Sequence, residues 1–371
     1  MRARAGDHEG AARALQVVLR VSPRNAGAWE ALGASYTVLG RHSAALKAFE
    51  RALELSEDSG DGARAYAAAQ TGHIQLTLGS SVDAAESYEK ALSDGVDRVA
   101  ALFGLARAHA YYAEGALRLG APGRAADSLR EARRAASRAV DALGESATAT
   151  FWKLLGDVHH LTARVNDPAH GKNVEATLAE RARAATAAVD AYEKALALSP
   201  DAPARWRDLV AALRLKTDVH VLLDDVTAAE TCAEEASRRA VGYVERAPGD
   251  ARAWFALAST AVGEDAASRD ARAMTALSRD VAIDPTFADA WCALGRLRLS
   301  RGDVAGARDA LDRARIADPS SGDAWTATAE LFVAGGRLEE ARGAFRTAAS
   351  LGAGCEAELG CALASCASSP A

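Results

Sequence analysis

Five of the six tryptophans in this chain follow a proline by the same interval. The interval is six residues, and the pairs are Pro23 and Trp29, Pro200 and Trp206, Pro248 and Trp254, Pro285 and Trp291, and Pro319 and Trp325. A spacing that recurs five times along 371 residues indicates an array of short repeats. It argues against two or three ordinary domains of about 150 residues each.

A longer frame surrounds several of these tryptophans. Around the first it reads Trp29, Leu32, Gly33, Tyr36, Ala45, Phe49 and Ala52, and it recurs as Trp291, Leu294, Gly295, Ala307, Leu311, Ala314 and Pro319. The frame resembles the tetratricopeptide pattern of two short helices per repeat. We therefore expect an all-α fold, a right-handed superhelical solenoid of tetratricopeptide-type helix pairs, some of them enlarged.

Each position of the frame has a physical role. Residues three and four apart share one face of a helix, so Trp, Leu and Tyr form the packing face of the first helix. Gly and Ala let the second helix approach closely, and Pro ends that helix because it has no amide hydrogen. Trp206 and Trp291 occupy the packing position and are therefore expected to be core anchors.

The frame also divides the chain. We expect one array over 1–371, with regular repeats at 7–95, enlarged repeats at 99–248, regular repeats again at 251–352, and an unpaired last helix at 354–367. An irregular insert is expected at 162–174. The array would start on a second helix and stop on a first helix, without polar capping helices. We therefore expect an internal segment of a longer chain.

Charge and hydropathy argue against two classes of partner, nucleic acids and membranes. A net charge of -6 and a pI near 5.8 argue against nonspecific binding of nucleic acid, and we expect no sequence-specific nucleic-acid contact. No apolar stretch reaches the roughly 18 residues of a membrane span, and the start lacks the apolar core of a signal peptide. We expect no membrane association and an intracellular location. The five cysteines form no CxxC pair, so we expect buried or idle thiols.

Catalytic motifs are not found. Gly171 and Lys172 fail the spacing of a phosphate-binding loop. His159 and His160 are adjacent, so they point about 100 degrees apart on a helix and share no metal face. The acidic pairs Asp224–Asp225 and Glu234–Glu235 are interpreted as the solvated face of one long helix. We expect no enzyme, no cofactor and no metal.

A binding surface remains. Positions one, five and eight after each tryptophan lie together on the first helix, on the face that lines the concave groove in helical-pair solenoids. Here they are Lys153, Asp157, His160, Arg207, Ala211, Arg214, Phe255, Ser259, Val262, Cys292, Arg296 and Leu299. Lys153, Asp157, Arg207 and Arg214 are the candidate partner-binding residues. The mixed chemistry indicates a folded protein or an extended segment as partner.

The central part of the chain has a more specific resemblance. Gly104, Leu105 and His109, followed by a long helix and then by FWKLLGDVHH at 151–160, resemble the enlarged central repeats of the tetratricopeptide scaffold subunits of superkiller (Ski) complexes. The resemblance implies a noncatalytic scaffold that holds an RNA helicase subunit and a WD40 propeller subunit. It also implies a cytoplasmic role, with the nucleus left open, in helping the cytoplasmic exosome degrade mRNA from 3' to 5'.

Two other readings stay open. A generic tetratricopeptide adaptor, such as a chaperone co-factor, clamps peptide tails with Lys and Asn side chains in its groove. None of the three asparagines lies at a groove position, and Lys153 is the one lysine there. The third possibility is the substrate-recruiting array of a larger enzyme. Flanking sequence would separate these readings, since further repeats favour the scaffold and a catalytic domain favours the enzyme.

Overall fold

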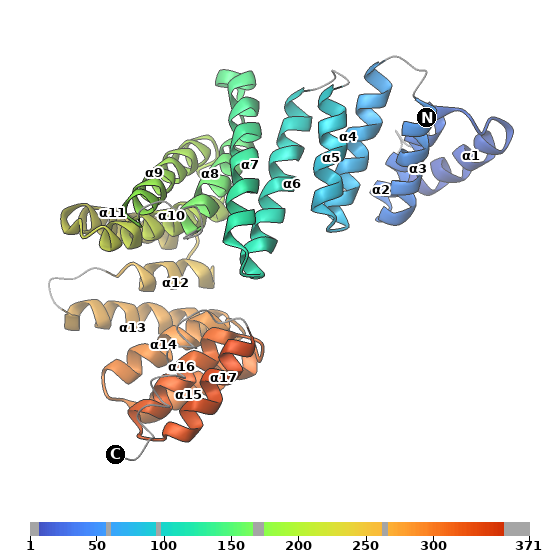
Figure 1. Cartoon of the computed structure of the whole chain (residues 1–371). Coiled ribbons are helices and arrows are strands. Elements are labelled where there is room, and N and C mark those ends of the chain that lie inside the picture. The colour runs from blue at the N-terminus through green and yellow to red at the C-terminus, as the bar shows by residue number, and fades with distance from the viewer. Residues whose placement is uncertain (1–6, 57–60, 94–97, 166–173, 262–265, 352–371) are drawn as a thin grey trace. The chain divides into compact units, whose positions relative to one another are not determined.

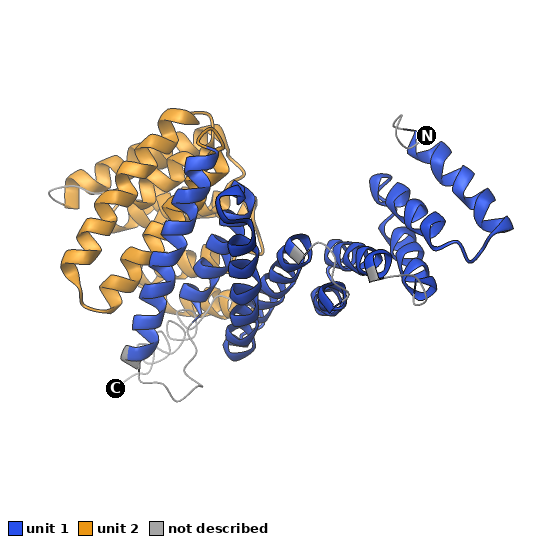
Figure 2. Cartoon of the chain, turned by 90° about the horizontal axis from the view of Figure 1, so that it is seen from above, with its two compact units in different colours: residues 1–199 blue, residues 200–371 orange. Residues whose placement is uncertain are grey.

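The computed structural model describes residues 7–56, 61–93, 98–165, 174–261 and 266–351. These residues form seventeen α-helices, and they contain no β-strand (Figure 1). The predicted all-α array of helix pairs is therefore confirmed. The helices belong to two compact units, residues 1–199 and 200–371 (Figure 2).

The first unit begins with a single helix and continues with four helix pairs. Its helices are α1 (His8–Val21), α2 (Ala26–Val38), α3 (His42–Leu55), α4 (Asp61–Thr77), α5 (Ser81–Ser93), α6 (Arg98–Arg118), α7 (Pro122–Leu143), α8 (Ala149–Arg164) and α9 (Val174–Leu198). Consecutive helices run in opposite directions and pack on one another (Figure 1). The helix α1 packs on α2, the first helix of the first pair.

The second unit consists of four further pairs. They are built from α10 (Pro203–Leu222), α11 (Val226–Arg246), α12 (Ala251–Ser259), α13 (Ala266–Ile283), α14 (Ala288–Ser300), α15 (Val304–Ala317), α16 (Gly322–Ala334) and α17 (Leu338–Ser350). The expected last helix at 354–367 lies outside the described residues. No described helix is both long and apolar enough to span a membrane.

The helices differ in length along the chain. The pairs α2–α3, α14–α15 and α16–α17 have helices of 13 or 14 residues, whereas α7, α9 and α11 have 22, 25 and 21 residues. The structure has a shorter insert than the predicted 162–174, because helices extend into both ends of this range. Thr162 to Arg164 continue α8, because their amides extend its ladder, and Val174 already belongs to α9. Residues 166–173 lie outside the described part of the chain.

The interval between proline and tryptophan has a direct structural cause. In all five pairs the indole N–H of the tryptophan donates a hydrogen bond to the carbonyl oxygen of the proline six residues earlier. The N–O distances are 2.9 Å for Trp29, Trp206, Trp254 and Trp291, and 3.2 Å for Trp325. The bond ties the end of one repeat to the first helix of the next.

Trp206 and Trp291 are core anchors, as predicted. Each side chain is only 7% exposed. The guanidinium groups of Arg246 and Arg313 lie over the two rings, 4.4 Å and 5.0 Å from the ring centroids. These cations cover the outer face of each indole and add a cation–π attraction.

Glycine is required where the two helices of a pair approach most closely. A Cβ added at Gly295 of α14 would lie 2.6 Å from the Leu311 side chain of α15. The same position in α8 is Gly156, where a Cβ would lie 2.7 Å from the Tyr192 ring of α9. The glycine of the sequence frame is therefore a contact point, as predicted.

Helix starts are marked by side-chain caps. Asn25, Asp225, Asp303 and Ser321 each accept a hydrogen bond from a backbone amide in the first turn of the helix that follows. Asp225 therefore does not lie in the long helix where the sequence analysis placed it. Asp224, with φ of 58°, turns the chain just before this cap.

The tryptophan anchor can be tested by two substitutions at one site. Trp291→Phe removes the indole N–H and should cost about 1 kcal/mol, the usual value of one hydrogen bond. Trp291→Ala also removes the ring and should cost about 3 to 5 kcal/mol. Urea unfolding followed by circular dichroism measures both. Equal losses for the two variants would mean that ring packing contributes nothing.

The close approach at Gly295 can be tested against a matched glycine. Gly295→Ala should destabilise the protein by about 1 to 3 kcal/mol, because Leu311 has to move. Gly343→Ala in α17 meets no atom within 4 Å, so it should be neutral or stabilise by up to about 1 kcal/mol through helix propensity. Thermal unfolding of both variants distinguishes crowding from propensity.

Candidate partner-binding surface

Successive first helices of the second unit share one face. Arg296 of α14 and Glu330 of α16 both lie five residues after their tryptophan. The Arg296 guanidinium binds the Glu330 carboxylate in bidentate fashion, with Nε–Oε2 of 3.0 Å and Nη2–Oε1 of 3.3 Å. Side chains at this position in neighbouring repeats therefore lie side by side, as the groove prediction requires.

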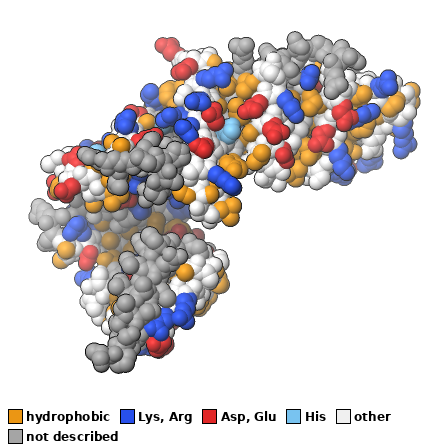
Figure 3. Space-filling view, viewed as in Figure 1, with side chains coloured by type: hydrophobic (Ala, Val, Ile, Leu, Met, Phe, Trp, Pro, Cys, Tyr) orange, Lys and Arg blue, Asp and Glu red, His pale blue; other side chains and the backbone are white. Residues whose placement is uncertain are grey.

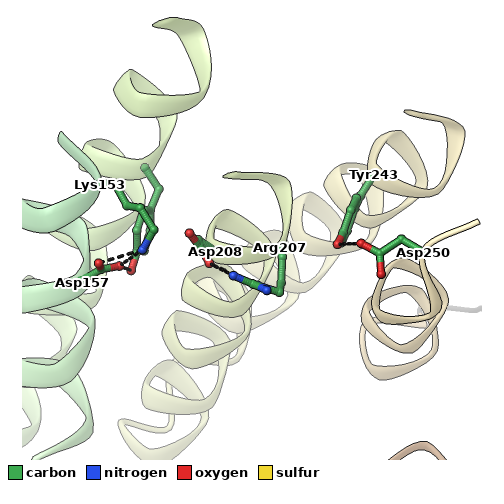
Figure 4. Close-up of polar contacts among 7 residues, drawn as sticks. Lys153, Asp157, Arg207, Asp208, Tyr243 and Asp250 are labelled. Atoms are coloured by element: carbon green, nitrogen blue, oxygen red, sulfur yellow. Dashed lines mark hydrogen bonds and ion pairs between the residues drawn. The ribbon is translucent and has the colours of Figure 1, made fainter. Parts of the chain in front are cut away.

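In the first unit, Lys153 and Asp157 form a local ion pair on α8. The Lys153 ammonium lies 2.8 Å from both carboxylate oxygens of Asp157 (Figure 4). The Tyr192 hydroxyl of α9 donates a further bond of 2.8 Å to Asp157. Both members of the ion pair are partly exposed. Asp157 therefore has a structural role between α8 and α9 as well as a place on the predicted surface.

In the second unit, Arg207 and Arg214 lie on α10. The Arg207 guanidinium lies 3.2 Å from the carboxylate of Asp208 (Figure 4). Arg214 is exposed, and its charge lowers the pKa of Asp218, whereas burial, the larger effect, raises it. Both arginines therefore lie beside a carboxylate of their own helix.

Three other residues predicted on the groove have different surroundings. Cys292 was expected on the groove and is instead buried in the core with Leu277 and Trp291, because its position turns toward α13. Burial raises the pKa of its thiol to about 12, so the thiol stays protonated. Phe255 packs edge-on against Phe287, with 5.2 Å between ring centroids. Val262 lies outside the described residues.

The thiol prediction can be followed for two cysteines. Cys232 and Cys292 are free and buried, as predicted. Cys355, Cys361 and Cys366 lie outside the described residues.

Sequence analysis missed an aromatic and cationic cluster on α6. The Arg107 guanidinium lies between the rings of Phe103 and Tyr111, 5.9 Å and 5.7 Å from their centroids. Phe103 in turn packs on Phe151 of α8, at 4.8 Å. Burial and then the charge of Arg107 lower the pKa of His73 on α4. The sequence did not reveal this cluster because α6 contains no tryptophan. The positions of its side chains in the repeat could therefore not be assigned by spacing.

A wide cleft lies between α5, α6 and α7. It encloses about 770 Å³, and His109 and Ser128 form part of its lining. The Ser128 hydroxyl donates to the His109 carbonyl oxygen at 2.9 Å, which joins α7 to α6. Acidic and basic side chains alternate around its edge, and Figure 3 shows the same interspersed charges on the visible face of the first unit. The cleft is therefore lined by both apolar side chains and charges of either sign.

The adjacent histidines on α8 face helix neighbours. His159 is half-buried, and its pKa is lowered by burial and then by the charge of Arg133 on α7. This placement agrees with the packing role predicted for it. Among the described residues, no group of three or more His, Cys, Asp and Glu side chains is arranged to hold a metal ion.

Of the acidic pair predicted on the long helix α11, the Glu235 carboxylate forms an ion pair with Arg239, one turn further along, at 2.7 Å.

Comparison with known proteins agrees with this architecture. A profile of the tetratricopeptide repeat family matches residues 2–63 and 292–354. A tetratricopeptide repeat protein from Parabacteroides merdae superimposes with a TM-score of 0.55 at 15% identity, covering 81% of this chain and 98% of that one. The C-terminal part of a repeat protein from Cytophaga hutchinsonii gives a TM-score of 0.51 at 14% identity, covering 79% and 96%. The fold is thus an all-α solenoid of the tetratricopeptide type.

Curated relatives are much longer than this chain. Tetratricopeptide repeat protein 37 of Xenopus laevis is 26% identical over 314 residues, which are 81% of this chain and 19% of the relative. Superkiller complex protein 3 of Mus musculus is 33% identical over 154 residues, which are 42% of this chain and 9% of the relative. The chain thus spans less than a fifth of the length of the curated relatives it matches.

The two roles of Asp157 can be separated by mutation. Lys153→Ala should cost less than about 1 kcal/mol, because the ion pair is partly exposed. Asp157→Ala should cost about 1 to 3 kcal/mol, because it also removes an acceptor of the buried Tyr192 hydroxyl group. Asp157→Asn keeps an acceptor oxygen and should fall between them. Chemical unfolding of the three variants measures this order, which a purely electrostatic role would not produce.

Proposed function

We propose that this chain is part of a noncatalytic protein scaffold of the superkiller complex. In this role it holds an RNA helicase subunit or a WD40 propeller subunit and so assists the cytoplasmic exosome in 3' to 5' mRNA decay. It works in the cytoplasm, it acts through protein contacts, and it needs no cofactor. The observation that carries the proposal is the 33% identity over 154 residues with Superkiller complex protein 3.

The enlarged repeats support a docking role. The helices α6, α7, α9, α10 and α11 have 20 to 25 residues each, against 9 to 18 in the helices of the regular repeats. Additional turns add surface without adding a catalytic group. A stable interface needs about 800 Å² from each partner, and long helices provide area of this order. We place the partner contacts in this central block, residues 99–246.

The charged side chains on the first helices favour a specific protein contact over nonspecific association. Arg207 is held by Asp208 at 3.2 Å and is thereby oriented, whereas Arg214 is exposed about two turns further along α10. Oriented charges on an interface fix its register and speed its formation more than they raise its affinity. We propose that Lys153 and Asp157 do the same in the first unit. Because Lys153 is already bound to Asp157, it is poorly suited to clamp the carboxylate of a peptide tail.

The proposal is tested by reversing charges on the first helices. Full-length protein carrying Lys153→Glu, Arg207→Glu and Arg214→Glu should recover at least about tenfold less helicase or propeller subunit in a pull-down, since opposed like charges cost several kcal/mol at an interface. The matched control reverses Arg51, Arg308 and Arg346, which are exposed on the second helices α3, α15 and α17, outside residues 99–246. Circular dichroism checks that both proteins fold.

The outcomes separate the alternatives. Loss of one subunit with the first variant and not with the control identifies that subunit as the partner of these residues. Unchanged recovery of both subunits would remove Lys153, Arg207 and Arg214 from the interface. Failure of the unaltered protein to recover either subunit would overturn the superkiller proposal itself.

A further inference from the structure

Asp280 occupies a place where the other repeats carry an uncharged side chain. It lies on α13, five residues before Pro285. The residues five before Pro200 and Pro319 are Ala195 and Ala314, both 0% exposed. Asp280 is also 0% exposed. A carboxyl group has therefore been placed at a fully enclosed position of the repeat.

The carboxyl group has no compensating contact. Neither oxygen of Asp280 has a hydrogen-bond partner among the described residues. The contrast is Tyr243, five residues before Pro248, which is equally buried but donates from its hydroxyl to Asp250 at 2.6 Å (Figure 4). Burying a charge without a partner is costly, so the group stays protonated instead.

The surrounding charges favour the protonated form as well. The pKa of Asp280 is raised from an ordinary value of 3.8 to about 7, first by burial and then by the nearby carboxylates Asp284 and Asp250. The packed helix α12 carries one ionisable residue, Arg252, whose charge instead lowers the pKa of Asp284. The ionisable residues of α14 are Asp289, Cys292, Arg296 and Arg298, and none of them contributes to the shift at Asp280.

The helix pair α12–α13, which contains Asp280, also has less packing than the pairs that follow it. The helix α12 has nine residues, whereas the corresponding helices α14 and α16 have thirteen (Figure 1). A cavity of about 470 Å³ lies beside it, lined in part by Val241, Trp254 and Leu257. Short helices depend on tertiary packing for stability, so this pair has less to hold it together.

We propose that the helix pair α12–α13 is a protonation-controlled opening point of the second unit, closed while Asp280 is neutral and opened locally when it ionises. The direction follows from linkage. The closed state binds the proton more tightly than the open state, so stability of the closed pair is greatest below about pH 4. It is lost as the pH rises toward 7 and is constant above that value. The pair α12–α13 is therefore more rigid in acidic than in neutral solution.

Hydrogen exchange of the full chain tests the proposal. Peptides from α12 and α13 are compared between the unaltered protein and Asp280→Ala at pH 5 and at pH 7.5, so that intrinsic exchange rates cancel. The ratio of opening constants, unaltered over variant, should rise more than tenfold from pH 5 to pH 7.5. Peptides from α16 and α17 should show no such rise.

Two further variants keep the result interpretable. Asp280→Asn imitates the neutral acid and should remove the pH dependence as Asp280→Ala does. Asp309→Ala removes an exposed carboxylate on α15 and should leave the pH dependence unchanged. The proposal is overturned if the unaltered protein and Asp280→Ala change in parallel with pH, or if Asp309→Ala abolishes the effect equally.

Discussion

The hydrogen bond from each tryptophan indole to the carbonyl of the preceding proline is the contact on which the stacking of repeats depends. A proline that follows the last turn of a helix cannot extend it, and its carbonyl lies outside that helix's hydrogen-bond ladder. The indole satisfies it at 2.9 to 3.2 Å and at the same time fills the core between two repeats. At five junctions, those that lead into α2, α10, α12, α14 and α16, one side chain thus joins the end of a repeat to the start of the next.

Much of this fold follows from short intervals in the sequence. The Pro–Trp spacing, the close-contact glycines and the lengths of the regular helices are set by residues near one another in the chain, so the pattern predicts them. Less predictable were the ends of the insert at 162–174 and the place of Asp225. Those depend on which residue caps a helix, and several residues near each boundary could do so.

The candidate surface was harder to read from the sequence. Spacing placed Arg296 on the groove face, where it meets Glu330 of the next repeat, yet it put Cys292 on that face too, and Cys292 is buried. Arg107 between two aromatic rings and the hydrogen bond from Tyr192 to Asp157 depend on residues that meet only after folding. Asp280 could not be recognised from the sequence. Helical periodicity predicts which face a residue lies on, but it does not predict whether a buried charge has a hydrogen-bond or ion-pair partner.

Each described helix packs closely only on helices one or two places away along the chain. Such a unit has no contact that staples distant parts together, so pulling on its ends loads every junction in series. The weakest junction then yields first, and the others keep their structure. In the second unit α12, with nine residues, is the shortest described α-helix, so we expect the pair α12–α13 to yield first under load and the unit to behave as an elastic element.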